Sequence, residues 1–148
     1  MINKLSKVKE LDSALSSVIL ILRVVIGIAM ILHGWKKIQN PFGWMPAEAS
    51  MQIPAVFQFL AAFSEFGGGI ALILGLLNPL TNFGIGITML TAVYFHMIVL
   101  GDPFVSLKGG SYEMALVYFA CNLLLFAAGP GKFSLDKLIF GGNKSEKQ

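Results

Sequence analysis

Three titratable side chains in an otherwise apolar sequence could exchange protons with a bound molecule. His33, His96 and Glu113 each fall near the end of an apolar segment, and the chain of 148 residues has only two histidines. Histidine titrates near neutral pH and can protonate or hydrogen-bond a carbonyl oxygen. We predict that these three residues converge and act on an organic ligand. Two histidines and a carboxylate could also bind a metal, but no HxxH or ExxH spacing places two ligands on one helix face, so we favour the organic ligand and predict no metal.

A second set of polar residues is expected deeper among the apolar segments. Arg23 and Glu65 fall near the middle of their segments, where an isolated charge costs roughly 3 kcal/mol or more. We therefore predict that they pair with each other, and that Asn122 joins them. With Lys36 and Tyr112, these residues form the predicted ligand-binding set. The pair could instead serve only to fix helix packing, and the two roles do not exclude each other.

The composition indicates that these residues lie in a membrane. Residues of the types AVILMFWYC make up 55% of the chain and charged residues only 13%, whereas soluble domains are about a quarter charged. The mean hydropathy is +0.73. Residues 66–101 contain no Asp, Glu, Lys or Arg, and this stretch alone approaches two spans of about 20 residues each. We predict an all-α integral membrane protein.

Apolar runs and helix breakers divide the chain into four expected spans, which predict a four-helix bundle. The spans are residues 16–33, 56–77, 80–100 and 112–128. The connections are a long loop at 34–55, a tight turn at Asn78-Pro79 and a second loop at 101–111. Gly129-Pro130-Gly131 should end the last span, and Ser134 should cap a short amphipathic helix. This gives an N-terminal segment 1–15, a bundle 16–129 and a C-terminal segment 130–148.

The placement of the lysines predicts the orientation. Seven lysines flank the bundle near the chain ends and three lie in the two long loops, so the positive-inside rule predicts that both termini are cytoplasmic. We expect a multi-pass protein of a bacterial inner membrane. The basic residues form no cluster of the kind that binds nucleic acid, and the single Cys121 permits no internal disulfide and no CxxC motif.

The order of several short motifs resembles the DoxX family of small four-span membrane proteins, over residues 22–136. The motifs are Leu22-Arg23 with Gly27, His33-Gly34-Trp35-Lys36-Lys37-Ile38, Glu65 followed by Gly67-Gly68-Gly69 and Gly75-Leu76, Met89 and His96, Tyr112-Glu113, and Gly129-Pro130-Gly131-Lys132-Phe133-Ser134-Leu135-Asp136. One departure is the turn Leu77-Asn78-Pro79, where the family often carries a small residue and an arginine.

The resemblance implies a membrane subunit associated with a quinone-linked oxidoreductase. A quinone would suit the predicted polar site, because its carbonyl oxygens need donors and its reduction needs protons. The sequence has no recognisable flavin, haem or iron–sulfur motif, so electron transfer would need a redox partner protein. The other partners that we expect are membrane lipid and the lipophilic small molecule. Two alternatives are a non-catalytic membrane anchor for a redox enzyme and a small-solute transporter. We rank the transporter last, since no inverted repeat is visible.

Overall fold

The structure is a computed structural model, which describes residues 11–141, and all the regular structure in this range is helical. The elements are α2 (Ser13–Gln39), α3 (Ala55–Leu74), α4 (Asn78–Tyr94), the π-helical turn η1 (Phe95–Val99), α5 (Glu113–Ala128) and α6 (Leu135–Phe140). The prediction of an all-α protein is confirmed. Lys4, Lys7, Lys9, Lys144 and Lys147, on which the topology prediction depends, lie outside the described residues, so the orientation of the termini stays a prediction.

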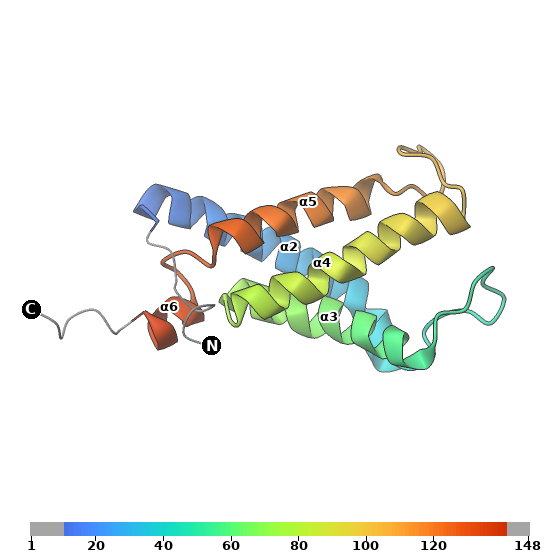
Figure 1. Cartoon of the computed structure of the whole chain (residues 1–148), viewed down its shortest axis with the longest axis horizontal. Coiled ribbons are helices and arrows are strands. Elements are labelled where there is room, and N and C mark those ends of the chain that lie inside the picture. Colours follow the sequence, from blue (N-terminus) through green and yellow to red (C-terminus); the bar gives the residue numbers. More distant parts are fainter. Residues whose placement is uncertain (1–10, 142–148) are drawn as a thin grey trace, which may run out of the picture.

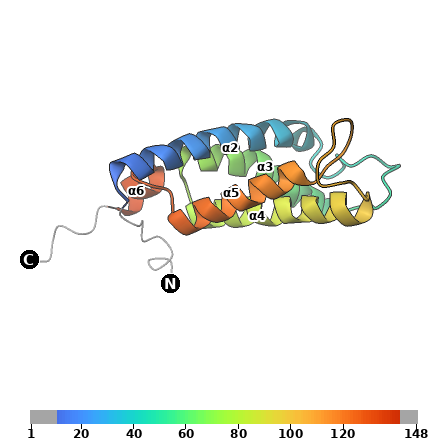
Figure 2. The same cartoon turned by 90° about the horizontal axis from the view of Figure 1, so that it is seen from above.

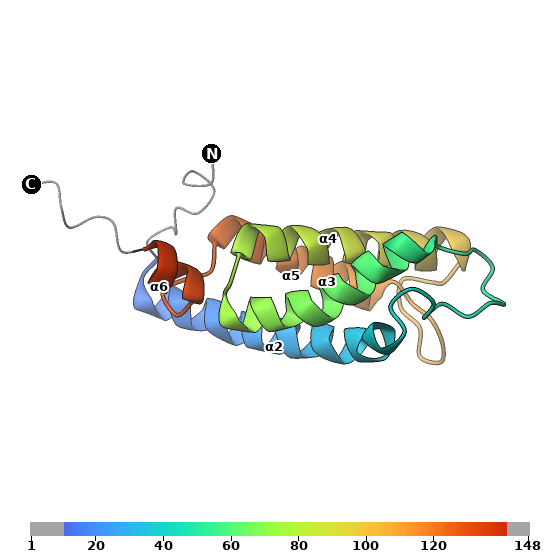
Figure 3. The same cartoon turned by 90° about the horizontal axis from the view of Figure 1, so that it is seen from below.

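The four longer helices form a bundle in which neighbours run antiparallel. α2 packs mainly against α3, α3 against α4, and α4 against α5, and all four lie side by side (Figures 1 and 2). The start of α2 and all of α6 lie at one end, which we call the α6 end. The loops 40–54 and 100–112 lie at the opposite end, which we call the loop end (Figure 3).

Three of these helical segments are long and apolar enough to cross a membrane. They are Ser13–Gln39, Ala55–Leu74 and the continuous segment Asn78–Val99 of α4 and η1. α5 has 16 residues, which gives a length of about 24 Å against a hydrocarbon core of about 30 Å. Large apolar side chains cover the outside of the bundle, Phe63 and Leu90 among them. This surface suits contact with lipid.

Helix α2 continues six residues beyond the predicted end at His33. No breaker occurs before Asn40-Pro41, so α2 continues to Gln39 and the first loop is shorter than predicted. Gly34 allows this extension to pack on α3, because a Cβ at Gly34 would lie only 2.5 Å from the backbone nitrogen of Phe66. The predicted span of 16–33 is therefore too short at its C-terminal end.

The turn between α3 and α4 also differs from the prediction. Asn78 and Pro79 do not form it, because they begin α4. Proline is tolerated there, since the first N–H groups of a helix have no partner within the helix. The reversal occurs at Gly75 and Leu77, which have φ angles of 64° and 49°. Asp136 holds the new helix start, since its carboxylate oxygens accept hydrogen bonds of 2.8 Å from the backbone nitrogens of Leu77 and Asn78.

The connection from α5 to α6 agrees with the sequence analysis. Gly129 adopts a φ of 84° directly after α5. The Ser134 Oγ accepts a hydrogen bond of 3.1 Å from the backbone nitrogen of Lys137 and so caps α6. The predicted helix stop and the predicted N-cap are both confirmed.

Candidate functional site

Arg23 joins its own helix α2 to two other segments at the α6 end by bonding to their backbone carbonyls. Its Nε donates to Leu72 O at 2.8 Å and its Nη2 to Ile73 O at 2.6 Å. Its Nη1 donates to Pro130 O at 2.6 Å and to Phe133 O at 2.9 Å. With 1% of its surface exposed, Arg23 has most of its donors committed to the protein.

The predicted pair of Arg23 and Glu65 is wrong. Glu65 instead pairs with Lys37, with 2.6 Å between Lys37 Nζ and Glu65 Oε1. Gly34 packs against the backbone of Glu65, and it lies eleven residues after Arg23. The two charges are thus separated by about 16 Å along the axis of α2. About 9 Å of this separation arises because depth was counted from a helix end placed six residues too early.

Asn122 belongs to a polar chain of its own and does not join a pair of Arg23 and Glu65. Its Nδ2 donates to Asn82 Oδ1 at 3.0 Å. Asn82 Nδ2 in turn donates to Asn78 Oδ1 at 2.8 Å and to the Asn78 carbonyl at 2.7 Å. All three side chains are buried. This chain joins α5 to α4 and satisfies polar groups that lipid could not hydrogen-bond.

No hydrogen bond or ion pair joins the three predicted acid–base residues to one another in the described part of the chain. The exposed His33 lies edge-on to Tyr118 with 5.9 Å between ring centroids. His96 Nδ1 is 2.7 Å from Asp102 Oδ2, and Glu113 begins α5. Within residues 11–141 no three His, Cys, Asp or Glu side chains are close enough to hold a metal ion together. The convergence of the three residues on an organic ligand and their individual catalytic roles stay predictions.

The remaining two predicted ligand-binding residues lie at the loop end. Lys36 is exposed near the end of α2. Tyr112 is half-buried directly before α5, and its ring centroid is 5.4 Å from that of Phe104. Their roles in ligand binding stay predictions as well.

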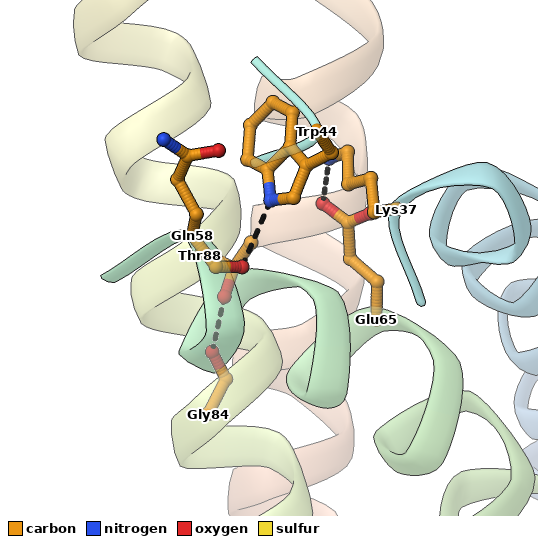
Figure 4. Close-up of polar contacts among 6 residues, drawn as sticks. All are labelled: Lys37, Trp44, Gln58, Glu65, Gly84 and Thr88. Carbon is orange, nitrogen blue, oxygen red and sulfur yellow. Dashed lines mark hydrogen bonds and ion pairs between the residues drawn. The ribbon is translucent and has the colours of Figure 1, made fainter. Parts of the chain in front are cut away.

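The most unusual polar group in the bundle is the carboxylate of Glu65. The residue is 2% exposed, and only its Oε1 has a partner, the ammonium group of Lys37 (Figure 4). The Oε2 atom and the neighbouring Ser64 Oγ are buried and have no hydrogen-bond partner. Leaving a buried polar group unpaired costs about 1–3 kcal/mol, and more when the group is charged. Glu65 Oε2 is thus open beside Lys37, whereas Ser64 Oγ lies on another side of α3, toward Gly84 of α4.

Loop 40–54 covers this site and is attached to α3. The Trp44 ring lies over Lys37, with 4.6 Å from Lys37 Nζ to the ring centroid. Trp44 Nε1 donates to the Gln58 carbonyl at 2.9 Å (Figure 4). The Gln58 side chain accepts from the Met45 nitrogen at 3.0 Å and donates to the Ile53 carbonyl at 2.8 Å. One buried glutamine thus connects the loop to the start of α3.

The spacing of buried residues explains why Lys37 and Glu65 face each other. The buried positions of α2 recur at intervals of mostly three or four, as Ser16, Ile19, Arg23, Ile26, Gly27, Met30 and Gly34, and Lys37 is the next member of this series. Those of α3 are Gln58, Ala62, Glu65, Gly69 and Leu72. Both charged residues therefore lie on inward faces. Sequence analysis missed Lys37 because it ended the helix at His33.

The site offers one hydrogen-bond donor group and one acceptor in apolar surroundings. The Lys37 ammonium has three N–H donors, of which one is directed at Glu65, and its side chain is 26% exposed. Glu65 Oε2 can accept a hydrogen bond. A lipophilic molecule with a small polar head could therefore bind both groups.

Comparison with known proteins places these features in context. The DoxX family model matches residues 18–97. The chain is 32% identical to the Inner membrane protein YqjF of Escherichia coli K12, over 82% of this chain and 91% of that protein. It is 26% identical to the Putative oxidoreductase CatD of Bacillus subtilis, over 85% of this chain and 90% of that protein. It is also 31% identical to an uncharacterized protein of Haemophilus influenzae, over 80% of this chain and 88% of that protein. No solved structure matches the chain. The apolar helices and these relatives indicate a bacterial membrane protein.

Proposed function

The chain belongs to the DoxX family, and we propose that it is the membrane component of an oxidoreductase system and binds a quinone-like lipophilic molecule at the Lys37–Glu65 site. The observation that carries this proposal is the carboxylate of Glu65, which is buried, paired on one oxygen and without a partner on the other. Such an arrangement is costly in an apolar bundle. A ligand that supplies a donor would remove part of that cost.

The chemistry of a quinone fits the two groups of the site. Its carbonyl oxygens accept hydrogen bonds, and a free N–H of Lys37 can donate to one of them. Its reduced form carries hydroxyl groups, which can donate to Glu65 Oε2. The Trp44 ring, which already covers Lys37, supplies an aromatic surface beside the polar head. The same site can thus bind the ligand in both oxidation states.

Reduction of a quinone to the hydroquinone consumes two electrons and two protons. In our proposal the electrons come from a redox partner protein, and the name of the relative CatD, a putative oxidoreductase, supports a redox setting. The protons come from water at the loop end, where η1 and the start of α5 lie (Figure 1). His96 and Glu113, on these elements, stay candidates for exchanging them, as does His33 one helical turn before Lys37.

The experiment compares the lysine of the site with an exposed lysine as control. The full chain is purified in mild detergent, its lipids are extracted, and quinones are measured by their ultraviolet absorbance. We expect near-stoichiometric quinone in the wild type and in Lys108→Met, and loss of most of it in Lys37→Met. Lys108 is exposed in the second loop, so its substitution matches the change in charge without touching the site.

Two results would count against the proposal. Wild-type protein that carries no quinone, although it elutes as a single folded species, would favour the non-catalytic anchor. Equal quinone content in both lysine variants would place the ligand elsewhere in the bundle. A melting temperature of Lys37→Met measured alongside shows whether loss of ligand comes from loss of fold.

A further inference from the structure

A groove at the α6 end has a chemistry that the proposed function does not use. It lies between the C-terminal end of α3 and the segment 132–141, with a volume of about 680 Å³. Its lining is formed by Ile73, Leu74, Lys132, Phe133, Ser134, Leu135, Lys137, Leu138 and Gly141. The groove thus combines an apolar wall with two lysines, and no acidic residue lines it.

The two walls of this groove are held at a fixed separation. Arg23 donates to the Ile73 carbonyl on one wall and to the Phe133 carbonyl on the other. The backbone nitrogen of Asp136 donates to the Gly75 carbonyl at 3.0 Å, directly after the α3 wall. Because these bonds join α3 to the C-terminal segment, the groove is a built feature of the fold.

The groove also lies where a membrane surface is expected. The apolar part of α3 ends at Leu74, and the apolar side chains beside it remain uncovered, with Leu138 78% exposed and Phe133 51% exposed. A short helix that combines apolar residues with a lysine suits the interface between acyl chains and head groups. We therefore expect the apolar side chains of the groove to face acyl chains and its lysines to lie at head-group level.

The charges of the surroundings favour an anion. The carboxylate of Asp136 is buried and already accepts from the backbone nitrogens of Leu77 and Asn78. Lys132 donates one hydrogen bond, to Ser13 Oγ at 3.1 Å, and its ammonium has two further N–H groups. Lys132 thus keeps N–H donors that an anion in the groove could accept.

We propose that this groove binds an anionic phospholipid. The phosphate would contact Lys132 and Lys137, and the acyl chains would lie between the apolar side chains of Leu74 on one wall and Leu138 on the other. A zwitterionic lipid of the same chain length would fit the apolar wall but would gain less from the two lysines. The proposal concerns the α6 end alone and does not depend on the site at Lys37 and Glu65.

Native mass spectrometry of the full chain in detergent tests the proposal. Phosphatidylglycerol and phosphatidylcholine with identical acyl chains compete for the protein. We expect a preference for phosphatidylglycerol of roughly tenfold, because interfacial lysines attract anionic head groups. The double variant Lys132→Gln/Lys137→Gln should bind both lipids equally. The control Lys36→Gln/Lys108→Gln removes two lysines near the loop end and should keep the preference.

The outcomes separate the possible sources of binding. Equal binding of both lipids by the wild type, or an unchanged preference in the Lys132/Lys137 variant, would overturn the proposal. Displacement of phosphatidylglycerol by millimolar inorganic phosphate, with no dependence on acyl chains, would show a simple anion site and would also overturn it. Lys132→Arg/Lys137→Arg, which keeps both charges, should retain the preference and so distinguishes loss of charge from loss of fold.

Discussion

Removing Lys37 should destabilise the protein more than removing its partner Glu65. Lys37→Met keeps most of the packing of the lysine stem and removes the ammonium that pairs with Glu65. The carboxylate, 2% exposed, is then left buried without its partner. Breaking a buried pair in this way costs about 3–5 kcal/mol. Because the Lys37 side chain is 26% exposed, water can partly replace it, and we expect about 3 kcal/mol.

The reverse substitution should cost less. Glu65→Met removes the buried carboxylate and leaves Lys37, whose long stem lets its ammonium move toward water. We therefore expect a loss of about 1–2 kcal/mol, in the range of one charged hydrogen bond. The double variant Lys37→Met/Glu65→Met has no buried charge to compensate and should be close to the Glu65→Met protein. The coupling energy between the two positions then equals the cost of Lys37→Met, about 3 kcal/mol.

Reversible unfolding in mixed micelles of mild detergent and dodecyl sulfate measures these differences. Tryptophan fluorescence is a suitable signal because the Trp44 ring lies over Lys37. Lys36→Met is the control for the single change and should be nearly neutral. The combination of Arg23→Met with Glu65→Met should be additive. A coupling of Lys37 with Glu65 below about 0.5 kcal/mol, or a Glu65→Met protein less stable than Lys37→Met, would refute the reasoning.

Two further predictions concern groups that hold the ends of the bundle. Arg23→Leu removes four hydrogen bonds to backbone carbonyls, so we expect a loss of about 4 kcal/mol in the same unfolding assay. Arg23→Lys should recover only a minor part of this loss because an ammonium lacks the planar fork. Full stability of Arg23→Lys would contradict this account. Trp44→Ala removes the cover of Lys37 and should increase its modification by an amine-reactive reagent several-fold, while Lys36 stays unchanged. Mass spectrometry of peptides gives both rates, and an equal increase at both lysines would show that Trp44 acts on the whole loop end.

Local signals in the sequence predicted local structure well. Gly129-Pro130-Gly131 ends α5 and Ser134 caps α6, as expected, because these residues impose their own backbone geometry. The apolar composition likewise predicted an all-α bundle. These inferences depend on neighbouring residues alone, so they needed no knowledge of the tertiary contacts.

The partners of the charged residues could not be read in the same way. An error of six residues at the end of α2 shifts depth by about 9 Å, and this was enough to pair Glu65 with the wrong cation. The partners of Arg23 are backbone carbonyls, one of them 107 residues away along the chain. Because every residue has a backbone carbonyl, the sequence does not indicate which of them accepts the bond. The inward position of Lys37 could have been predicted from the sequence, since it continues the series of buried positions through Met30 and Gly34.

The two ends of the bundle use their buried polar groups differently. At the α6 end, Arg23 and Asp136 bond to backbone groups of distant segments, which is what a structural clamp requires. Among the residues that the structure describes, the buried side-chain oxygens without a partner are Ser64 Oγ and Glu65 Oε2. These two residues are consecutive on α3. Glu65 Oε2 lies beside the covered Lys37, whereas Ser64 Oγ lies toward Gly84 on α4. An open carboxylate oxygen next to an ammonium group is the feature that supports our proposal of ligand binding at Lys37 and Glu65.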